Sequence, residues 1–167
     1  MIFVTVGTHE QQFNRLVQYI DDLKKDGIIQ EDVIIQTGFC TYEPKHCEWS
    51  KLIPYKKMIE NVEKARIVIT HGGPSSFIMP LQINKIPIVV PRQEKFDEHV
   101  NNHQLEFSKA VAERQKNIIV VENIEDLKDC ILNYEDKIAK LSNGLESNNK
   151  VFNDEFEKIV GGLVNGR

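Results

Sequence analysis

Short apolar runs, rich in β-branched residues, alternate along the chain with segments whose apolar residues have helical spacing. The apolar runs predict strands at 2–6, 32–37, 47–53, 66–70, 86–91 and 117–122. The helical spacing predicts helices from Phe13 to a stop at Gly27, at 55–65, from 74 or 75 onward, at 97–115 and at 124–132. Because the strands are continuously apolar, both faces of the sheet should be covered. We therefore predict an α/β, Rossmann-like, doubly wound fold with a parallel sheet.

Three polar loops follow predicted strands: 7–12 ("GTHEQQ"), 71–76 ("HGGPSS") and 92–99 ("RQEKFDEH"). In doubly wound sheets, ligands bind beyond the carboxyl ends of the strands. We therefore expect these three loops to stand together around one binding site.

The loop "HGGPSS" has a composition that suits a phosphate-binding start of a helix. Two glycines let another group approach the backbone, and Pro74 suits the first helical position. Free backbone N–H groups would then point out of the helix, those of Gly73, Ser75 and Ser76, toward an anion such as a diphosphate. The alternative is a tight turn without a ligand. No GxGxxG or GxxxxGK[ST] sequence supports the usual dinucleotide or P-loop sites.

The size and charge of the chain narrow its class. Its 167 residues fit one domain, and a net charge of −4 does not favour nonspecific nucleic-acid binding. No apolar run reaches the roughly 20 residues that span a bilayer, and the start "MIFVTVGT" is a strand pattern rather than a leader. We expect a cytoplasmic protein whose three cysteines, Cys40, Cys47 and Cys130, are free thiols.

The segment after residue 142 differs from the rest. Residues 143–149 are polar and resemble a linker, and an apolar stripe at helical spacing follows: Phe152, Phe156, Ile159, Val160 and Leu163. We divide the chain into a Rossmann-like domain at 1–142 and a linker with an amphipathic helix at 143–167. That helix either packs on its own domain or reaches a partner.

The segments "FVTVGTHEQQFNRL", "VITHGGPSSF" and "IPIVVPRQEKFDEHVNNHQLEF" resemble the donor-binding half of family 28 glycosyltransferases. The likeness covers Met1 to Asn133. It is greatest to small subunits of two-part bacterial enzymes of capsule and exopolysaccharide synthesis, commonly β-1,4-galactosyltransferases. The chain is also similar to the small subunit of the two-part N-acetylglucosamine transferase of the dolichol pathway. The resemblance implies a single half of a GT-B fold with a C-terminal helical tail.

The resemblance also implies roles for residues of a UDP-sugar site. The diphosphate would lie on Gly7, Thr8, His71, Gly72, Gly73, Ser75 and Ser76. The uracil would be received near Ile53, Pro54 and Tyr55, and the donor sugar near Gln93, Glu98 and His99. His9 lines the same cleft and is a candidate general base, although the resemblance suggests that the base lies on the partner.

The helix after the glycine loop departs from the family pattern. Relatives often carry an acidic residue there that binds the ribose hydroxyls, and here the position falls on Met79, which cannot accept such hydrogen bonds. Gln82 would be a weak substitute. If this helix runs from Pro74 to Asn84, Pro80 lies in its interior and kinks or ends it.

A complete enzyme of this type has two Rossmann-like halves, and this chain holds one. The resemblance therefore implies a membrane-anchored partner subunit that presents a lipid-linked sugar acceptor, with the tail stripe as its contact. The reaction would be an inverting transfer without a cofactor or metal, since no Asp-x-Asp motif is present.

Other interpretations remain open. The chain could be a regulatory module that binds a nucleotide sugar without catalysis, or a flavodoxin-like or dinucleotide-binding oxidoreductase. His99 and His103 could bind zinc, as could Cys40, His46 and Cys47, but neither set has a standard zinc-site pattern.

Overall fold

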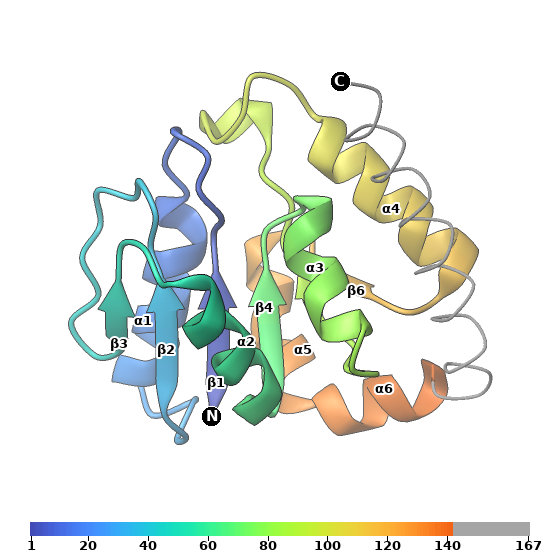
Figure 1. Cartoon of the computed structure of the whole chain (residues 1–167), viewed down its shortest axis with the longest axis horizontal. Helices are drawn as coiled ribbons and strands as arrows, with labels where there is room; N and C mark the ends of the chain where they lie inside the picture. The colour runs from blue at the N-terminus through green and yellow to red at the C-terminus, as the bar shows by residue number, and fades with distance from the viewer. Residues whose placement is uncertain (142–167) are drawn as a thin grey trace.

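Six parallel strands in the order β3-β2-β1-β4-β5-β6 form the centre of the computed structural model, which describes residues 1–141 (Figure 1). The strands are β1 (Ile2–Thr5), β2 (Val33–Gln36), β3 (Glu48–Ser50), β4 (Ile67–Thr70), β5 (Ile88–Val89) and β6 (Ile119–Val120). Each neighbouring pair runs parallel. This strand order is that of a Rossmann fold, which confirms the predicted fold class.

Helices cover both faces of the sheet, as Figure 1 shows. They are α1 (Asn14–Lys25), α2 (Tyr55–Lys64), α3 (Pro74–Leu81), α4 (His103–Gln115), α5 (Leu127–Leu132) and α6 (Tyr134–Leu141), with the short 3-10 helices η1 (Glu94–Phe96) and η2 (Ile124–Asp126). The apolar side chains of α1 and α5 pack on one face, and those of α2, α3 and α4 pack on the other.

The strand residues alternate between two apolar clusters, which explains why the strands read as continuous apolar runs. In β1, Ile2 and Val4 join the cluster with α1 and α5. Phe3 points the other way and packs with Val62 of α2 and Val68 of β4. Full burial of such side chains contributes about 1.5–3 kcal/mol each to stability.

The predicted helix at 97–115 is wrong in its first six residues, because α4 begins only at His103. Asp97 has a left-handed backbone (φ 58°), which interrupts any helix. The side chain of Asn101 accepts a hydrogen bond from the N–H of His103, and that of Asn102 accepts one from the N–H of Glu94. These local bonds compete with helix formation, so residues 97–102 form a loop.

Other boundaries also differ from the predictions. Helix α3 ends at Leu81 and not at Asn84, with Pro80 in its last turn. The predicted helix at 124–132 divides into η2 and α5, and α6 was not predicted. Strands β5 and β6 are shorter than the apolar runs around them. The predicted linker at 143–149 and the stripe from Phe152 to Leu163 lie outside the described residues.

Candidate functional site

A cleft of about 950 Å³ lies between α2 and α3, at the edge where β1, β2 and β4 end. Its inner part is apolar and is formed by Phe3, Ile53, Met58, Val62, Val68, Ile78 and Met79. The polar groups come from strand ends, loops and both ends of α3: Thr5, Gln36, Gly7, Thr8, His9, His71, Ser75, Ser76 and Gln82. The strand order reverses between β1 and β4, which is where ligands of such sheets bind.

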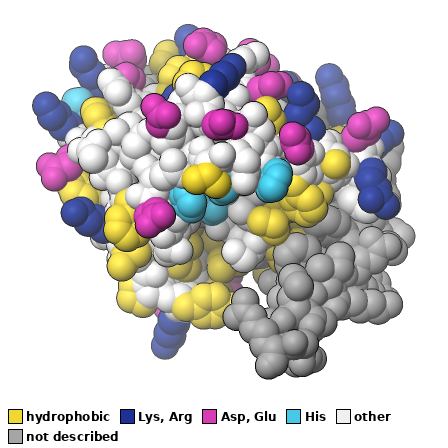
Figure 2. Space-filling model, turned by 90° about the horizontal axis from the view of Figure 1, so that it is seen from above, with side chains coloured by type: hydrophobic (Ala, Val, Ile, Leu, Met, Phe, Trp, Pro, Cys, Tyr) yellow, Lys and Arg dark blue, Asp and Glu magenta, His cyan; other side chains and the backbone are white. Residues whose placement is uncertain are grey.

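Most of the predicted site residues line this cleft, including Tyr55, whose side chain is exposed. Pro54, Gly72 and Gly73 belong to the same loops but are not part of the lining, and neither are Gln93, Glu98 and His99. Figure 2 views this edge of the sheet from above, where histidine side chains gather among hydrophobic ones. The three predicted loops do meet here.

The ring of His71 fills the space between two glycines of different loops. A Cβ added at Gly7 would lie 2.3 Å from Nε2 of His71, and one added at Gly73 would lie 2.2 Å from its Cε1. Gly7 also has a backbone φ of 77°, which other residues rarely adopt. Both glycines are therefore needed for the imidazole to sit where it does.

His71 is an uncharged hydrogen-bonding residue in this site. Burial, followed by the nearby Arg92 charge, lowers the pKa of His71 to about 3. The N–H of Gly73 donates to its Nδ1 (3.1 Å), and its Nε2 lies 2.9 Å from Oγ of Ser76. A positive charge on this histidine is therefore not what the site offers to an anion at neutral pH.

The start of α3 offers fewer free N–H groups than the sequence predicted. The N–H of Gly73 is bound by His71, and that of Ser76 donates to the carbonyl of Gly73 (3.0 Å). Of the three predicted donors, only the N–H of Ser75 has no acceptor among the described residues. The serine hydroxyls, both in the lining, are thus the main side-chain donors at this end of the cleft.

The rings of His9 and His99 stack at the mouth of the site, with centroids 4.6 Å apart and planes 10° apart. Nε2 of His9 lies 2.9 Å from Oε1 of Gln11, and His9 lines the cleft. Burial and then the neighbouring His9 lower the pKa of His99. Since His99 lies on the loop before α4, it does not share a helix face with His103.

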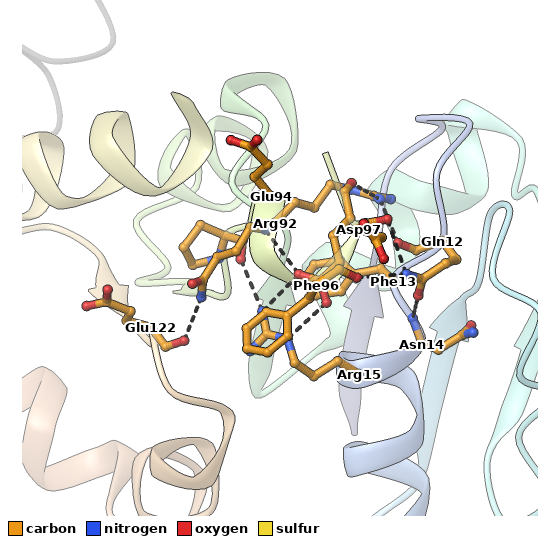
Figure 3. Close-up of polar contacts among 12 residues, drawn as sticks. Gln12, Phe13, Asn14, Arg15, Arg92, Glu94, Phe96, Asp97 and Glu122 are labelled. Atoms are coloured by element: carbon orange, nitrogen blue, oxygen red, sulfur yellow. Dashed lines mark hydrogen bonds and ion pairs between the residues drawn. The ribbon is translucent and has the colours of Figure 1, made fainter. Parts of the chain in front are cut away.

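Gln93 and Glu98, predicted to face the donor sugar, have partners inside the protein. The Glu98 carboxylate is fully buried, forms an ion pair with Arg15 (2.9 Å) and accepts the N–H of Gln93 (3.1 Å). The Gln93 side chain donates to the carbonyl of Glu122 (2.8 Å), the residue that Figure 3 labels at this contact. In this conformation they support the loops and do not face the cleft.

Arg92, which sequence reasoning missed, joins the first and third loops. Its fully buried guanidinium donates to the carbonyls of Val6 (2.8 Å), Gln11 (2.8 Å) and Glu98 (3.0 Å). It also lies 5.1 Å from the ring centroid of Phe13, among the residues drawn in Figure 3. The only available signal was a charged residue directly after an apolar strand.

A polar pair forms part of the cleft where β1 and β2 end. The hydroxyl of Thr5 accepts the N–H of Gly7 (3.2 Å) and donates to Oε1 of Gln36. The amide NH₂ of Gln36, which also lines the cleft, is then the group available to a ligand acceptor.

Lys85 connects the two helices that form the walls of the cleft. Lys85 follows the end of α3 in the sequence. Its ammonium group donates to three carbonyls at the end of α2, those of Val62 (2.7 Å), Glu63 (2.5 Å) and Ala65 (2.7 Å). Burial lowers the pKa of Lys85. A cation at a helix C-terminus is stabilising, so this contact holds α2 beside α3.

The described residues were also compared with the other chemical predictions. All three cysteines are free thiols, as predicted. Within residues 1–141, no three His, Cys, Asp or Glu residues are grouped so that they could hold a metal ion. No helix in that range is long and apolar enough to cross a bilayer.

The strand order and the cleft at its reversal point define a Rossmann-like half-domain of the kind found in GT-B glycosyltransferases. Residues 1–159 match the glycosyltransferase family 28 C-terminal domain, and the chain belongs to that family. It is 36% identical over 117 residues to the human UDP-N-acetylglucosamine transferase subunit ALG13, covering 65% of this chain and 10% of that protein.

Two solved structures share the fold. The glycosyltransferase SnogD from Streptomyces nogalater matches with a TM-score of 0.58 and 13% identity, over 89% of this chain and 39% of that one. The glycotransferase of kitacinnamycin matches with a TM-score of 0.58 and 14% identity, over 94% of this chain and 42% of that one. The chain therefore spans less than half the length of each of these relatives.

Proposed function

We propose that the cleft binds a UDP-sugar and that this chain is the donor-binding subunit of a two-part inverting glycosyltransferase. The observation that carries the proposal is the cleft itself. It joins an apolar inner part, which suits a uracil ring, to neutral donors at the start of α3, which suit a diphosphate. Membership of family 28 and the similarity to a UDP-N-acetylglucosamine transferase subunit support it.

The chemistry follows from where charge develops. As an acceptor hydroxyl attacks the anomeric carbon, the bond to the diphosphate breaks and negative charge grows on the leaving UDP. The Ser75 N–H, the hydroxyls of Ser75 and Ser76 and the start of α3 would stabilise that charge without reorganising. Neither a cofactor nor a metal is part of this proposal.

A partner would supply the acceptor half. Five exposed hydrophobic side chains lie at the carboxyl edge of the sheet: those of Phe39, Leu52 and Val100 in loops, Tyr55 at the start of α2 and Phe96 at the end of η1. Such a surface suits contact with a second polypeptide. We propose that the partner is membrane-anchored, recruits this cytoplasmic chain to the inner face of the membrane and presents a lipid-linked acceptor. Galactosyl transfer in exopolysaccharide or capsule synthesis is our specific proposal.

The general base is proposed to lie on the partner, with His9 as the candidate in this chain. His9 lines the cleft, but its Nε2 is in hydrogen-bond contact with the Gln11 side chain and its ring is stacked on that of His99. His9→Ala should leave turnover of the assembled pair nearly intact if the partner supplies the base. A loss of about 100-fold or more in kcat would assign the base to His9.

Calorimetric titration of the purified chain with UDP, with NAD as the control, tests the donor site. We expect micromolar UDP binding and none of NAD. Gly73→Ala should abolish binding because its Cβ would displace His71. Gly27→Ala is a control remote from the site: no atom lies within 4 Å of the added Cβ, but the backbone φ of 75° makes it strained, so it should cost stability and leave UDP binding unchanged. Binding of NAD in place of UDP would refute the proposal.

Transfer by the chain mixed with its membrane partner separates catalysis from regulation. UDP-galactose and UDP-N-acetylglucosamine should be compared as donors, since the human relative is a subunit for the latter. Binding of the donor without transfer by the assembled pair would favour the regulatory alternative.

A further inference from the structure

Gln104 of α4 is not part of the cleft lining, yet its side chain contacts the glycine loop from behind. Its Oε1 accepts hydrogen bonds from the backbone N–H groups of Gly72 (3.1 Å) and Arg92 (3.1 Å). Backbone N–H groups can only donate, so these two bonds fix which end of the amide is the oxygen. The NH₂ group must then face Nδ1 of His71, 3.3 Å away.

The position of the proton on His71 follows from these donors. Nδ1 receives the N–H of Gly73 as well as the amide of Gln104, so it carries a lone pair and no proton. The neutral ring therefore has its proton on Nε2, which donates to Oγ of Ser76 (2.9 Å). With its oxygen already accepting, Ser76 has its own hydroxyl proton free to donate to a ligand in the cleft.

We propose that Gln104 is a positioning residue, which together with the Gly73 N–H fixes the Nε2–H tautomer of His71 and thereby keeps the Ser76 hydroxyl proton available to the donor diphosphate. This inference rests on the proposed function for its ligand, but the tautomer exists without a ligand. Four hydrogen bonds connect Gln104 of α4 to Gly72, to Arg92 and, through His71, to Ser76. Of these residues, only His71 and Ser76 line the cleft.

Helix α4 packs closely against the glycine loop. A Cβ added at Gly72 would lie 2.8 Å from Cβ of Gln104 and 3.0 Å from Oγ of Ser108, so α4 lies directly against the loop. A residue larger than glycine at position 72 would therefore push α4, and Gln104 with it, away from the loop.

The decisive variant is Gln104→Glu, which keeps the size of the side chain. A carboxylate can accept the N–H groups of Gly72 and Arg92 but cannot donate to Nδ1 of His71. The carboxylate should then draw the ring proton to Nδ1, at the cost of the hydrogen bond that the Gly73 N–H donates there. Its Nε2 becomes an acceptor for the Ser76 hydroxyl, which withdraws that proton from the ligand. UDP binding should weaken about tenfold.

The ¹⁵N NMR spectrum of the histidine rings reports the tautomer directly, in the full chain without ligand. We expect the proton on Nε2 of His71 in the parent and on Nδ1 in Gln104→Glu. A parent spectrum with the proton on Nδ1 would overturn the inference, and it can be recorded even if the variant fails to fold. The NMR test does not depend on UDP binding. Failure of the proposed function can therefore be distinguished from failure of this inference.

A double-mutant cycle tests the link to the ligand. Ser76→Ala should weaken UDP binding about five- to tenfold in the parent, but less than about twofold in the Gln104→Glu background. Gln18→Glu, on the exposed surface of α1, is the control for the added negative charge and should leave UDP binding unchanged. Equal effects of Ser76→Ala in both backgrounds would reduce Gln104 to a purely structural role.

Discussion

Replacing Arg92 with Met should destabilise the protein by about 3 kcal/mol. The guanidinium donates to three carbonyls at 3.0 Å or less, those of Val6, Gln11 and Glu98. Hydrogen bonds that involve a charged group contribute about 2 kcal/mol each, or roughly 6 kcal/mol in total. Met no longer carries the desolvation cost of a buried charge, which offsets about half of that sum.

Urea unfolding, followed by the fluorescence of the single tryptophan, Trp49, measures this loss. At a slope of about 2 kcal/mol per molar urea, the midpoint should fall by about 1.5 M. Arg114→Met is the matched control, because Arg114 is exposed on α4 and its loss should cost less than about 0.5 kcal/mol. Arg92→Lys should be intermediate, since an ammonium group cannot reproduce the planar fork.

The reasoning would be refuted by a loss below about 1 kcal/mol for Arg92→Met, or by an equal loss for the Arg114 control. A fall in UDP affinity should accompany the loss of stability, because Arg92 holds the backbone of the first loop. Unchanged affinity would mean that this loop keeps its shape without the guanidinium.

Three further predictions follow from the site. Burial lowers the pKa of His71 to about 3 from its ordinary 6.5, so its contribution to stability is complete above pH 6.5 and is lost as pH falls toward 3. This costs up to about 1.4 kcal/mol per pH unit, and urea midpoints at pH 7 and pH 5 should differ less in His71→Asn. Gln36→Leu should weaken UDP binding five- to tenfold by removing an amide donor from the cleft, and unchanged calorimetry would exclude that role. Burial raises the pKa of Cys47 to about 12 and also raises that of Cys130, so mass spectrometry should find both slow to alkylate at pH 8 until urea is added.

The sequence predicted the fold well because five of the six strands lie within apolar runs. Strand β3, at the edge of the sheet, is the exception, because Glu48 and Ser50 are exposed and Trp49 between them is half-buried. The start of α4 was predicted wrongly because side-chain hydrogen bonds determine where this helix begins. Asn101 and Asn102 bind backbone N–H groups, and spacing of apolar residues does not reveal such bonds.

The site was predicted at the level of loops but not at the level of atoms. Parallel strands bring their carboxyl ends to one edge, so the three loops had to meet. Whether a polar group faces the ligand depends on its partners, and these come from distant positions. The Glu98 carboxylate pairs with Arg15, and the Gly73 N–H is held by His71, so neither is available to a ligand.

The contacts of Arg92 also constrain the order in which the protein folds. Arg92 is 81 positions from Gln11 and 86 positions from Val6. The conformation of the first loop therefore depends on a residue that is distant in sequence. Contacts of such separation form slowly, because chain closure must precede them. During synthesis, the first loop emerges early and must wait for the strand that precedes Arg92. Pulsed hydrogen exchange should therefore find residues 7–12 among the last to gain protection, so that the proposed nucleotide site is completed only when folding is complete.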